Sequence, residues 1–322
     1  MISKSRLIGT ALGAVAALAM TMPVAADEYP SRTITMVIPY PAGQGTDLAG
    51  RYYAERLSEA LGQTVVVDNR PGAGGNVGTA SATREDADGY VIFMGASGTH
   101  AMNPAMHSDP GYDAAADFDP VAATIVIPMA ISANPELGVS SIPELVEAAQ
   151  ARPGEIDVAL PSVTAQLVLQ MLTDHDAPLN GINYGGSGEA TAAVLGNEVP
   201  VLIDTLGASS RHFERLAPLA VTSPEAVSSH PDLPSVAEQG LEGFSVTAWN
   251  VLYTLAGTPE PIRERLRDEM REILSDPATA EAMTELGFVL SPWMEREELE
   301  AWEQGERDRY GDLIRAAGLA AD

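Results

Sequence analysis

A stretch near the start of the chain has the residue types needed to bind an anion. Residues 34–47 read Ile-Thr-Met-Val-Ile-Pro-Tyr-Pro-Ala-Gly-Gln-Gly-Thr-Asp, so a β-branched run leads into a glycine-rich loop and then a helix that begins near Thr46-Asp47. The first amides of a helix have no internal acceptor, and the helix dipole places partial positive charge on them. This stretch can therefore hold a carboxylate or a phosphate without a lysine or arginine.

Two more glycine-rich loops follow the next two apolar runs. One reads Asn69-Arg-Pro-Gly-Ala-Gly-Gly-Asn76, and the other reads Gly95-Ala-Ser-Gly-Thr-His-Ala-Met-Asn-Pro104. Taken alone, the first of these predicts no more than a tight connection. In an open parallel sheet, however, ligands bind at the carboxyl ends of the strands. We therefore expect the three loops to meet at one end of the sheet.

Other kinds of site find weaker support. Gly43-Gln-Gly45, with Asp68 at the end of the next strand, is similar to a dinucleotide-binding turn, but Leu48 stands where the third glycine belongs. Ser97 and the segment 185–189 both lack the closing glycine of a hydrolase nucleophile elbow. The five histidines show no metal-ligand spacing, and the absence of cysteine excludes thiol catalysis, zinc–thiolate sites and iron–sulfur clusters. No catalytic set is visible, and we expect neither a metal nor a cofactor.

Short apolar runs alternate with helical patterns along almost the whole chain. This alternation predicts an α/β fold with a mostly parallel sheet and helices on both faces. The predicted strands are 34–38, 64–68, 91–95, 122–127, 156–160, 199–203, 217–221 and 251–255, and the predicted helices are about 47–61, 76–84, 142–151, 164–173, 188–196, 261–275 and 295–317. The capping box Ser141-Ile-Pro-Glu144 marks one helix start.

No flexible linker is evident in the sequence. Two domains would therefore be joined by tight crossings, and the two segments that fit are near 125–131 and 247–255. A cleft between two such domains would be a natural ligand site that closes by a hinge motion.

The first 26 residues have the pattern of a secretory signal peptide. Lys4 and Arg6 precede an apolar run that ends at Met22, and small residues at 24–26 predict a cut after Ala26. The alternative is an uncleaved membrane anchor, although the apolar run is short for a transmembrane span.

The chain is strongly acidic. It has 45 Asp and Glu residues against 18 Lys and Arg residues, which gives a net charge of −27, and loss of Lys4 and Arg6 with the signal peptide takes this to −29. Such a charge repels nucleic acids and anionic membrane surfaces, so neither is an expected partner. We also hypothesise that the protein stays soluble in high salt, where self-repulsion is screened. A stability that falls steadily as salt is added would contradict this hypothesis.

Several long segments, in this order, resemble the Bug-type solute receptors, which are the periplasmic substrate-binding proteins of tripartite tricarboxylate transporters. The segments are YPSRTITMVIPYPAGQGTDLAGRYYAERLSEALGQTVVVDNRPGAGGNVGTA, DADGYVIFMGASGTHAMNPAM, INYGGSGEATAAVLGNEVPVLIDTL, LAPLAVTSPEAVSSHPDLPSVAEQGLEGF and AGTPEPIRERLRDEM. The resemblance covers essentially all of residues 29–317. It implies a type II periplasmic-binding-protein fold, in which two α/β domains joined by hinge strands close on a small di- or tricarboxylic acid, aromatic acid, amino acid or nicotinate-like compound.

The resemblance also implies which residues contact the ligand. In the family, amides of the first loop hold one carboxylate, partly through ordered water, and a tyrosine flanks the ligand. The matching residues here are Tyr40, Ala42, Gly43, Gln44, Gly45, Thr46 and Asp47 of the first loop, Ser97, Gly98 and Thr99 of the third loop, and Ser162, Thr164 and Asp204 of the second domain.

Two departures from the family pattern bear on the ligand. Gln44 stands where the family usually has a third glycine, and its side chain either reaches the ligand or points to solvent. The segment 159–167 is shorter than its family counterpart, and Gln166 replaces a histidine. That loop holds the distal end of the ligand in relatives. The departure therefore leaves two alternatives open: a different ligand, or different contacts to the same ligand.

These observations predict a periplasmic, monomeric solute-binding protein without enzymatic activity. It would deliver a small carboxylate to the membrane subunits of a tripartite tricarboxylate transporter, or to a sensor. The expected division is a signal peptide at 1–26, a discontinuous first domain of 27–126 plus 251–322, and a second domain of 127–250. The alternatives are a secreted enzyme that acts on a carboxylated substrate and a cell-envelope protein without a ligand.

Overall fold

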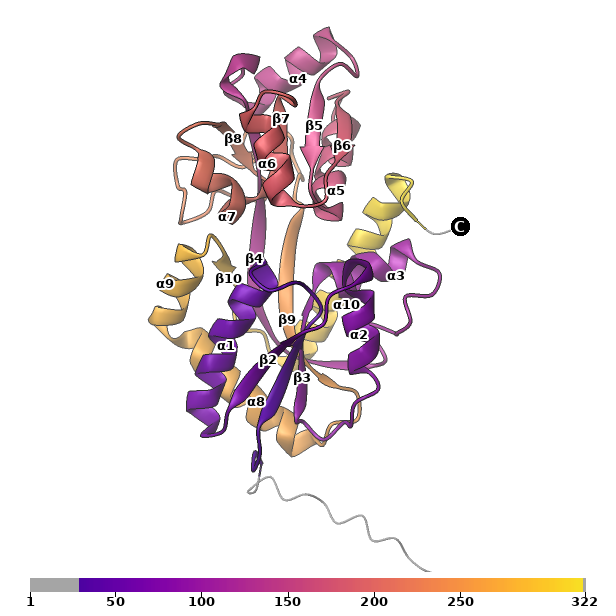
Figure 1. Ribbon diagram of the computed structural model, residues 1–322, viewed down its shortest axis with the longest axis vertical. Coiled ribbons are helices and arrows are strands. Elements are labelled where there is room, and N and C mark those ends of the chain that lie inside the picture. The colour runs from indigo at the N-terminus through magenta and orange to yellow at the C-terminus, as the bar shows by residue number, and fades with distance from the viewer. Residues whose placement is uncertain (1–28, 321–322) are drawn as a thin grey trace, which may run out of the picture.

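The protein has two lobes that lie one above the other along its long axis (Figure 1). The computed structural model describes residues 29–320, so the predicted signal peptide lies outside the described residues. We call the two parts the lower lobe and the upper lobe, as they stand in Figure 1.

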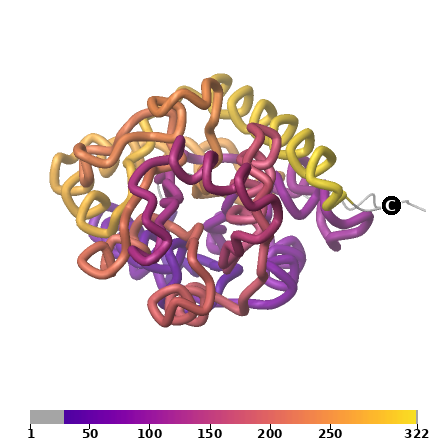
Figure 2. Tube along the Cα trace, turned by 90° about the horizontal axis from the view of Figure 1, so that it is seen from above, coloured from indigo at the N-terminus to yellow at the C-terminus, as the bar shows by residue number. Residues whose placement is uncertain are grey.

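The lower lobe is built from both the first and the last parts of the described chain. Its elements are β1 (Ile34–Ile38), α1 (Gly45–Leu61), β2 (Val65–Asn69), α2 (Asn76–Ala82), β3 (Val91–Ala96), α3 (Asn103–Met106), α8 (Glu260–Ser275), α9 (Pro277–Glu285), β10 (Val289–Leu290) and α10 (Arg296–Ala316). β1 pairs in parallel with β2 and β3 and is buried on both faces, which explains its continuous apolar sequence. Seen from above, α10 runs along one side of the molecule (Figure 2).

The upper lobe is built from the middle of the chain. Its elements are α4 (Ile142–Ala151), β5 (Asp157–Leu160), α5 (Val163–Asp174), β6 (Asn180–Asn183), α6 (Ser187–Leu195), β7 (Val201–Thr205), α7 (Leu206–Ser209) and β8 (Ala217–Val221). β5 pairs in parallel with β6 and β7. The predicted start of α4 is confirmed, because the Ser141 side chain accepts a hydrogen bond from Glu144 N.

Two long antiparallel strands join the lobes. β4 (Phe118–Ala133) pairs first with β9 (Thr247–Leu255), and beyond Pro128 it pairs with β7 and β8 of the upper lobe. Buried Thr222 lies at this change of partner, where its hydroxyl donates to Val246 O (2.6 Å) and accepts from Met129 N (3.1 Å). The Thr222 side chain therefore hydrogen-bonds both segments that connect the lobes, at Met129 of β4 and at Val246 just before β9.

The sheet differs from the sequence prediction in its strand directions. It is mixed and not mostly parallel, because β4 rises into the upper lobe and β9 returns beside it. The strand predicted at 122–127 is the middle of the 16-residue β4. The sequence did not predict β6, β10, α3, α7 or α9. β6 reads Asn-Gly-Ile-Asn and has no apolar run to mark it.

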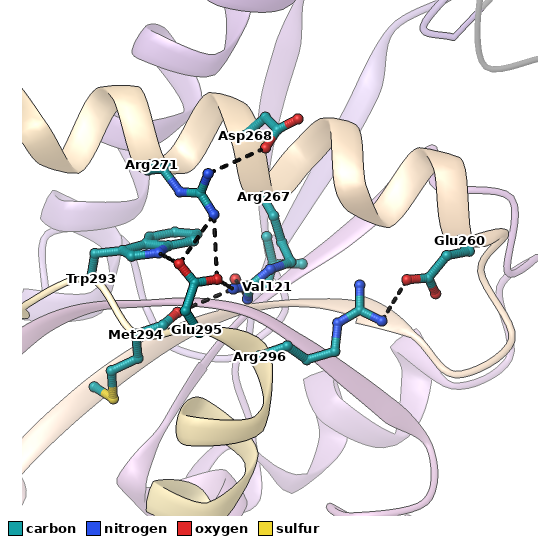
Figure 3. A network of polar contacts seen from close by, with 9 residues as sticks. All are labelled: Val121, Glu260, Arg267, Asp268, Arg271, Trp293, Met294, Glu295 and Arg296. Carbon is teal, nitrogen blue, oxygen red and sulfur yellow. Dashed lines mark hydrogen bonds and ion pairs between the residues drawn. The ribbon is translucent and has the colours of Figure 1, made fainter.

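A buried arginine fastens α8 to its neighbours in the lower lobe (Figure 3). Arg267 Nη1 donates to Val121 O of β4 (2.6 Å), and Nη2 donates to Met294 O, just before α10 (3.1 Å). The Trp293 ring lies 4.7 Å from the guanidinium of Arg267 and 4.8 Å from that of Arg271, so two cations share one aromatic ring. These contacts join helix, strand and connecting segment at one place.

Candidate functional site

The amino end of α1 opens into the space between the lobes. Gln44 holds the N-cap position with extended backbone angles, and its side chain makes no capping hydrogen bond. Among residues 29–320, the amides of Gly45, Thr46 and Asp47 have no acceptor. A 17-residue helix with free first-turn amides is a site for a small anion, because its dipole adds to the hydrogen bonds.

Asp47 holds the loop that precedes α1. Its buried carboxylate accepts hydrogen bonds from Arg51 Nε (3.0 Å), Gly43 N (2.7 Å) and Asn69 Nδ2 (2.9 Å). Burial alone would raise the pKa of Asp47, but these hydrogen bonds and the Arg51 charge together lower it. Asp47 is therefore ionised and already engaged within the protein, and it accepts the hydrogen bond of the Gly43 amide that the family resemblance assigned to a ligand.

The three glycine-rich loops meet around Tyr40. Asn69 Nδ2 donates to Tyr40 O (3.0 Å), which joins the first loop to the end of β2. A Cβ on Gly98 would lie 2.5 Å from Tyr40 Oη, and a Cβ on Gly75 would lie 2.6 Å from Thr99 Cγ2. Gly75 also has a φ of +101°, which side chains rarely adopt. The predicted convergence of the three loops is confirmed, and it depends on glycine at these two positions.

A cavity of about 390 Å³ lies between these loops and the upper lobe. Its lining residues are Tyr40, Gln44, Gly45, Thr46, Gly74, Ala96, Ser97, Gly98, Met102 and Asn103 from the lower lobe, Ile127, Met129, Ala248 and Asn250 from the crossing strands, and Pro161, Ser162, Val163, Thr164 and Thr205 from the upper lobe. Thr164 Oγ1 and Met102 Sδ lie 3.9 Å apart, one from each lobe. Apolar walls with a few fixed polar groups are typical of small-molecule sites.

Asn250 on β9 sets the orientation of the Thr46 hydroxyl. Asn250 Nδ2 donates to Gly95 O (3.2 Å) and to Thr46 Oγ1 (3.1 Å). A carbonyl oxygen can only accept, so Gly95 fixes which end of the amide carries the protons. The Thr46 hydroxyl therefore accepts from Asn250 and keeps its own proton to donate. Asn250 Oδ1 is buried at the cavity wall and has no donor among residues 29–320.

A second cavity, of about 440 Å³, adjoins the first. The two share Gln44, Gly45, Pro161, Ser162 and Thr205, and the second is also lined by Gly43, Leu48, Gly185, Gly186, Ser187, Asp204, Gly207, Ala208, Arg211, Leu286 and Phe288. The two cavities are therefore neighbouring parts of one cleft, with Gln44 at their boundary.

The carboxyl group of Asp204 lies at the wall of the second cavity, at the end of β7. Its Oδ1 accepts from Ser187 Oγ (3.0 Å) and Thr205 N (2.7 Å), whereas Oδ2 has no donor within the described chain. Burial raises the pKa of Asp204 to about 6, although the two hydrogen bonds oppose the shift. Asp204 therefore takes up a proton more readily than an ordinary aspartate.

Most residues predicted for the site lie at one cavity or the other. Tyr40, Gln44, Gly45, Thr46, Ser97, Gly98, Ser162 and Thr164 line the first cavity, and Gly43 and Asp204 line the second. Ala42, Asp47 and Thr99 line neither. Thr99 instead stabilises its own loop, because its hydroxyl contacts the Ala96 backbone and lies 2.9 Å from His100 Nδ1.

Sequence reasoning missed Asn103, Thr205, Asn250, Ser187 and Arg211, although all five line the cavities. A usable signal existed only for Asn250, a polar residue inside the apolar run Trp-Asn-Val-Leu-Tyr. Gln166, which departs from the family pattern, does not line either cavity.

Two features are absent between Tyr29 and Ala320: a group of metal-binding side chains and a helix that could span a membrane. In that range no three His, Asp or Glu side chains are grouped in a way that could hold a metal ion. No helix in the same range combines the length and the apolar character needed to cross a membrane.

The sequence is similar to a family of transport receptors. Residues 49–319 match the family model described as "Tripartite tricarboxylate transporter family receptor". A UPF0065 protein of Bordetella bronchiseptica is 33% identical over 319 residues, which cover 97% of this chain and 94% of that protein. Protein BugT of Bordetella pertussis is 32% identical over 315 residues, which cover 94% of this chain and 95% of BugT.

Solved structures with similar sequences share the fold. The periplasmic binding protein BugD has a TM-score of 0.78 and 30% identity, with 91% of this chain and 100% of BugD covered. Rpa4515 of R. palustris, solved with adipate, has a TM-score of 0.82 and 29% identity, with 91% and 99% covered. MatC from Rhodopseudomonas palustris, solved with bound malate, has a TM-score of 0.75 and 26% identity, with 89% and 100% covered.

Proposed function

Because the chain belongs to the family of tripartite tricarboxylate transporter receptors, we propose that it is a solute-binding protein that captures a small carboxylate by closing its two lobes. The fold is the type II periplasmic-binding-protein fold that the family resemblance implied. Adipate and malate in two similar structures support a carboxylic acid as the class of ligand here.

The observation that carries this proposal is the uncapped amino end of α1 at the cavity wall. A carboxylate oxygen placed there accepts hydrogen bonds from the free amides and from the Thr46 hydroxyl. Each charge-assisted hydrogen bond of this kind contributes about 1.5–3 kcal/mol. The net charge of the chain repels an anion at long range, but salt screens this beyond about 8 Å. Local donors therefore decide the binding.

Contacts to the ligand are proposed from both lobes. Gly45, Thr46 and the Ser97–Gly98 turn hold one carboxylate, with Tyr40 packed beside it. Ser162 and Thr164 reach the ligand from the upper lobe, and Gln44 lies over the boundary between the two cavities. Asp47 and Thr99 act indirectly, because their side chains hold the loops in place.

The biological setting is also a proposal. The chain is exported and cut after Ala26, and it works in the periplasm as a monomer. It delivers its ligand to the membrane subunits of a tripartite tricarboxylate transporter, or to a sensor. The domain division proposed from the sequence, 27–126 plus 251–322 and 127–250, places the boundary close to Pro128, where β4 changes partner.

A panel of carboxylic acids tests this function. We expect one or a few aliphatic or aromatic acids to raise the melting temperature saturably, and titration calorimetry to show one-to-one binding. Thr46→Val should weaken that binding roughly ten-fold, about one charge-assisted hydrogen bond. Thr33→Val, at an exposed residue before β1, is the matched control and should bind normally.

Two results would contradict the proposal. A melting temperature unchanged by every acid would mean that the protein is not a carboxylate receptor. Consumption of the acid, followed by NMR of the ligand over hours, would favour the enzyme alternative over a receptor that returns its ligand unchanged.

A further inference from the structure

The second cavity contains a cation that the protein does not neutralise. Arg211 lines this cavity together with Asp204 and Ser187. Most arginines between residues 29 and 320 pair with a carboxylate, as Arg51 does with Asp47 and Arg309 does with Glu306. The exposed side chain of Arg211 forms neither an ion pair nor a hydrogen bond within the described chain. Its exposed guanidinium is therefore available to a ligand at the cleft of a protein with 45 acidic and 18 basic residues.

The same cavity receives a second set of free donors. Gly185, Gly186 and Ser187 form its wall where the nine-residue helix α6 begins. Gly186 is the N-cap and has no side chain to cap the helix. The amides of residues 187–189 have no acceptor among residues 29–320. The upper lobe therefore presents an open helix terminus to the second cavity, as the lower lobe does to the first.

The carboxyl group of Asp204 completes this wall. It is 1% exposed, and its Oδ2 has no donor within the described chain while Oδ1 has two. A protonated Asp204 can donate from Oδ2 to an anionic ligand, and the pKa of Asp204 is raised to about 6 by burial, which favours proton uptake beside an anion. An ionised Asp204 would instead accept a hydrogen bond from a ligand ammonium group. The two cases call for different ligands.

Arg211 decides between these two cases. A guanidinium in the same cavity repels an ammonium group and attracts a carboxylate, with which it forms two parallel hydrogen bonds. Glu189, in the first turn of α6, accepts a hydrogen bond from Gly185 N (3.2 Å) and does not line the cavity. Charge at this end of the cleft therefore favours a second anionic group.

We propose that Arg211 is the residue that gives this cleft its preference for a dicarboxylate, because it binds the second carboxylate in the cavity beside Asp204. This inference rests on the proposed function, in which the first carboxylate lies at the amino end of α1. The two cavities share a wall at Gln44 and Ser162, so one flexible ligand can reach both.

The test compares acids of equal length that differ only at the far end. Saturated dicarboxylates of four to eight carbons are titrated against the wild-type protein and Arg211→Gln, together with their monocarboxylate and ω-amino counterparts, such as adipate, hexanoate and 6-aminohexanoate. For the best chain length, we expect the wild type to bind the dicarboxylate at least about ten-fold more tightly than the monocarboxylate. Arg211→Gln should abolish this difference and leave monocarboxylate affinity within about two-fold of the wild-type value.

A matched control separates local recognition from general charge. Arg215→Gln removes an exposed arginine four residues later that does not line the cavity, and it should leave the selectivity intact. Thermal unfolding of the free variants checks that each one folds.

The possible failures are distinct. Equal affinity of the wild type for di- and monocarboxylates, or an equal loss for both acids in Arg211→Gln, overturns this inference and leaves the proposed function standing. Tight binding of the ω-amino acid that is lost in Asp204→Asn and kept in Arg211→Gln also overturns it. Binding of no acid by the wild type overturns the proposed function itself.

Discussion

The carboxylate of Asp47 receives donors from three different segments of the lower lobe: the first loop, α1 and the end of β2. Asp47→Ala removes all three hydrogen bonds and leaves the Gly43 amide without an acceptor. We expect a loss of about 2–3 kcal/mol in unfolding free energy, measured by urea denaturation. We also expect ligand affinity to fall roughly ten-fold or more, because the loop before α1 is no longer held.

Asp68→Asn is the matched control for this prediction. Asp68 pairs with Arg70 at the surface (2.8 Å), and such pairs contribute about 0–1 kcal/mol. An Asp47→Ala protein with wild-type stability would show that the loop is held by other contacts.

Single residues of the site were predictable where backbone geometry dictates the residue type. Glycine at 75 and 98 follows from the close approach of Tyr40 and Thr99, and the loops that contain these glycines are visible in the sequence. Arg211 was not predictable, because nothing in Ser-Ser-Arg-His indicates that the turn after α7 faces a cavity. The hydrogen bonds of Asp47 within the protein were not predictable for a similar reason. A carboxylate beside a binding loop can bind either the ligand or the loop, and only the positions of Arg51 and Asn69 distinguish the two.

The side chain of Arg267 connects three elements of the lower lobe, as Figure 3 shows: α8, β4 and the segment before α10. Arg267→Ala leaves the buried Val121 carbonyl without a donor and removes the cation above Trp293. We expect a loss of about 2–3 kcal/mol in unfolding free energy, with ligand affinity unchanged, because none of these groups lines the cleft.

Arg265→Ala controls for loss of an arginine from the same helix. Arg265 pairs with Glu269 at the helix surface (2.8 Å), so its removal should cost under about 0.5 kcal/mol. If the two variants unfolded at the same urea concentration, the bonds of Arg267 would not be what fixes α8.

Elements with their own periodic pattern were predicted well, and elements defined by their partners were not. Helix α4 occupies the predicted residues, 142–151, because Ser141 caps it and its apolar residues repeat at helical spacing. β10 consists of two residues and exists only through its pairing with Val126 and Ile125 of β4. The antiparallel direction of β4 and β9 is likewise a property of the assembled sheet, since an apolar run has the same appearance in either direction.

The pH dependence of stability belongs to the whole molecule, and one buried acid gives it a measurable component. Glu303 on α10 is buried against Tyr253, and this burial raises its pKa to about 7, although a hydrogen bond from Tyr253 and the Arg307 charge oppose the shift. Between about pH 4.5 and 7 the folded protein then binds more protons at this site than the unfolded chain. Stability contributed here therefore falls as pH rises through that range.

Glu303→Gln removes this titration. The variant should equal the wild type in stability near pH 4 and exceed it above pH 7 by on the order of 2–3 kcal/mol, measured by urea denaturation across pH. Glu281→Gln, at an exposed residue of α9, should give a difference from wild type that does not vary with pH. A constant difference for Glu303→Gln would mean that Glu303 titrates normally in the folded protein.

The place of β9 within the sheet also sets the order in which the protein can be made. In the lower lobe β9 lies between β3 and β4, and it pairs with both. The edge of β3 therefore stays unpaired until the chain up to residue 255 is available for folding, whereas β5, β6 and β7 of the upper lobe are complete by residue 205. The lobe that begins the chain is therefore the lobe that finishes folding last, so an emerging chain needs protection for its unpaired β3 edge until its final third arrives.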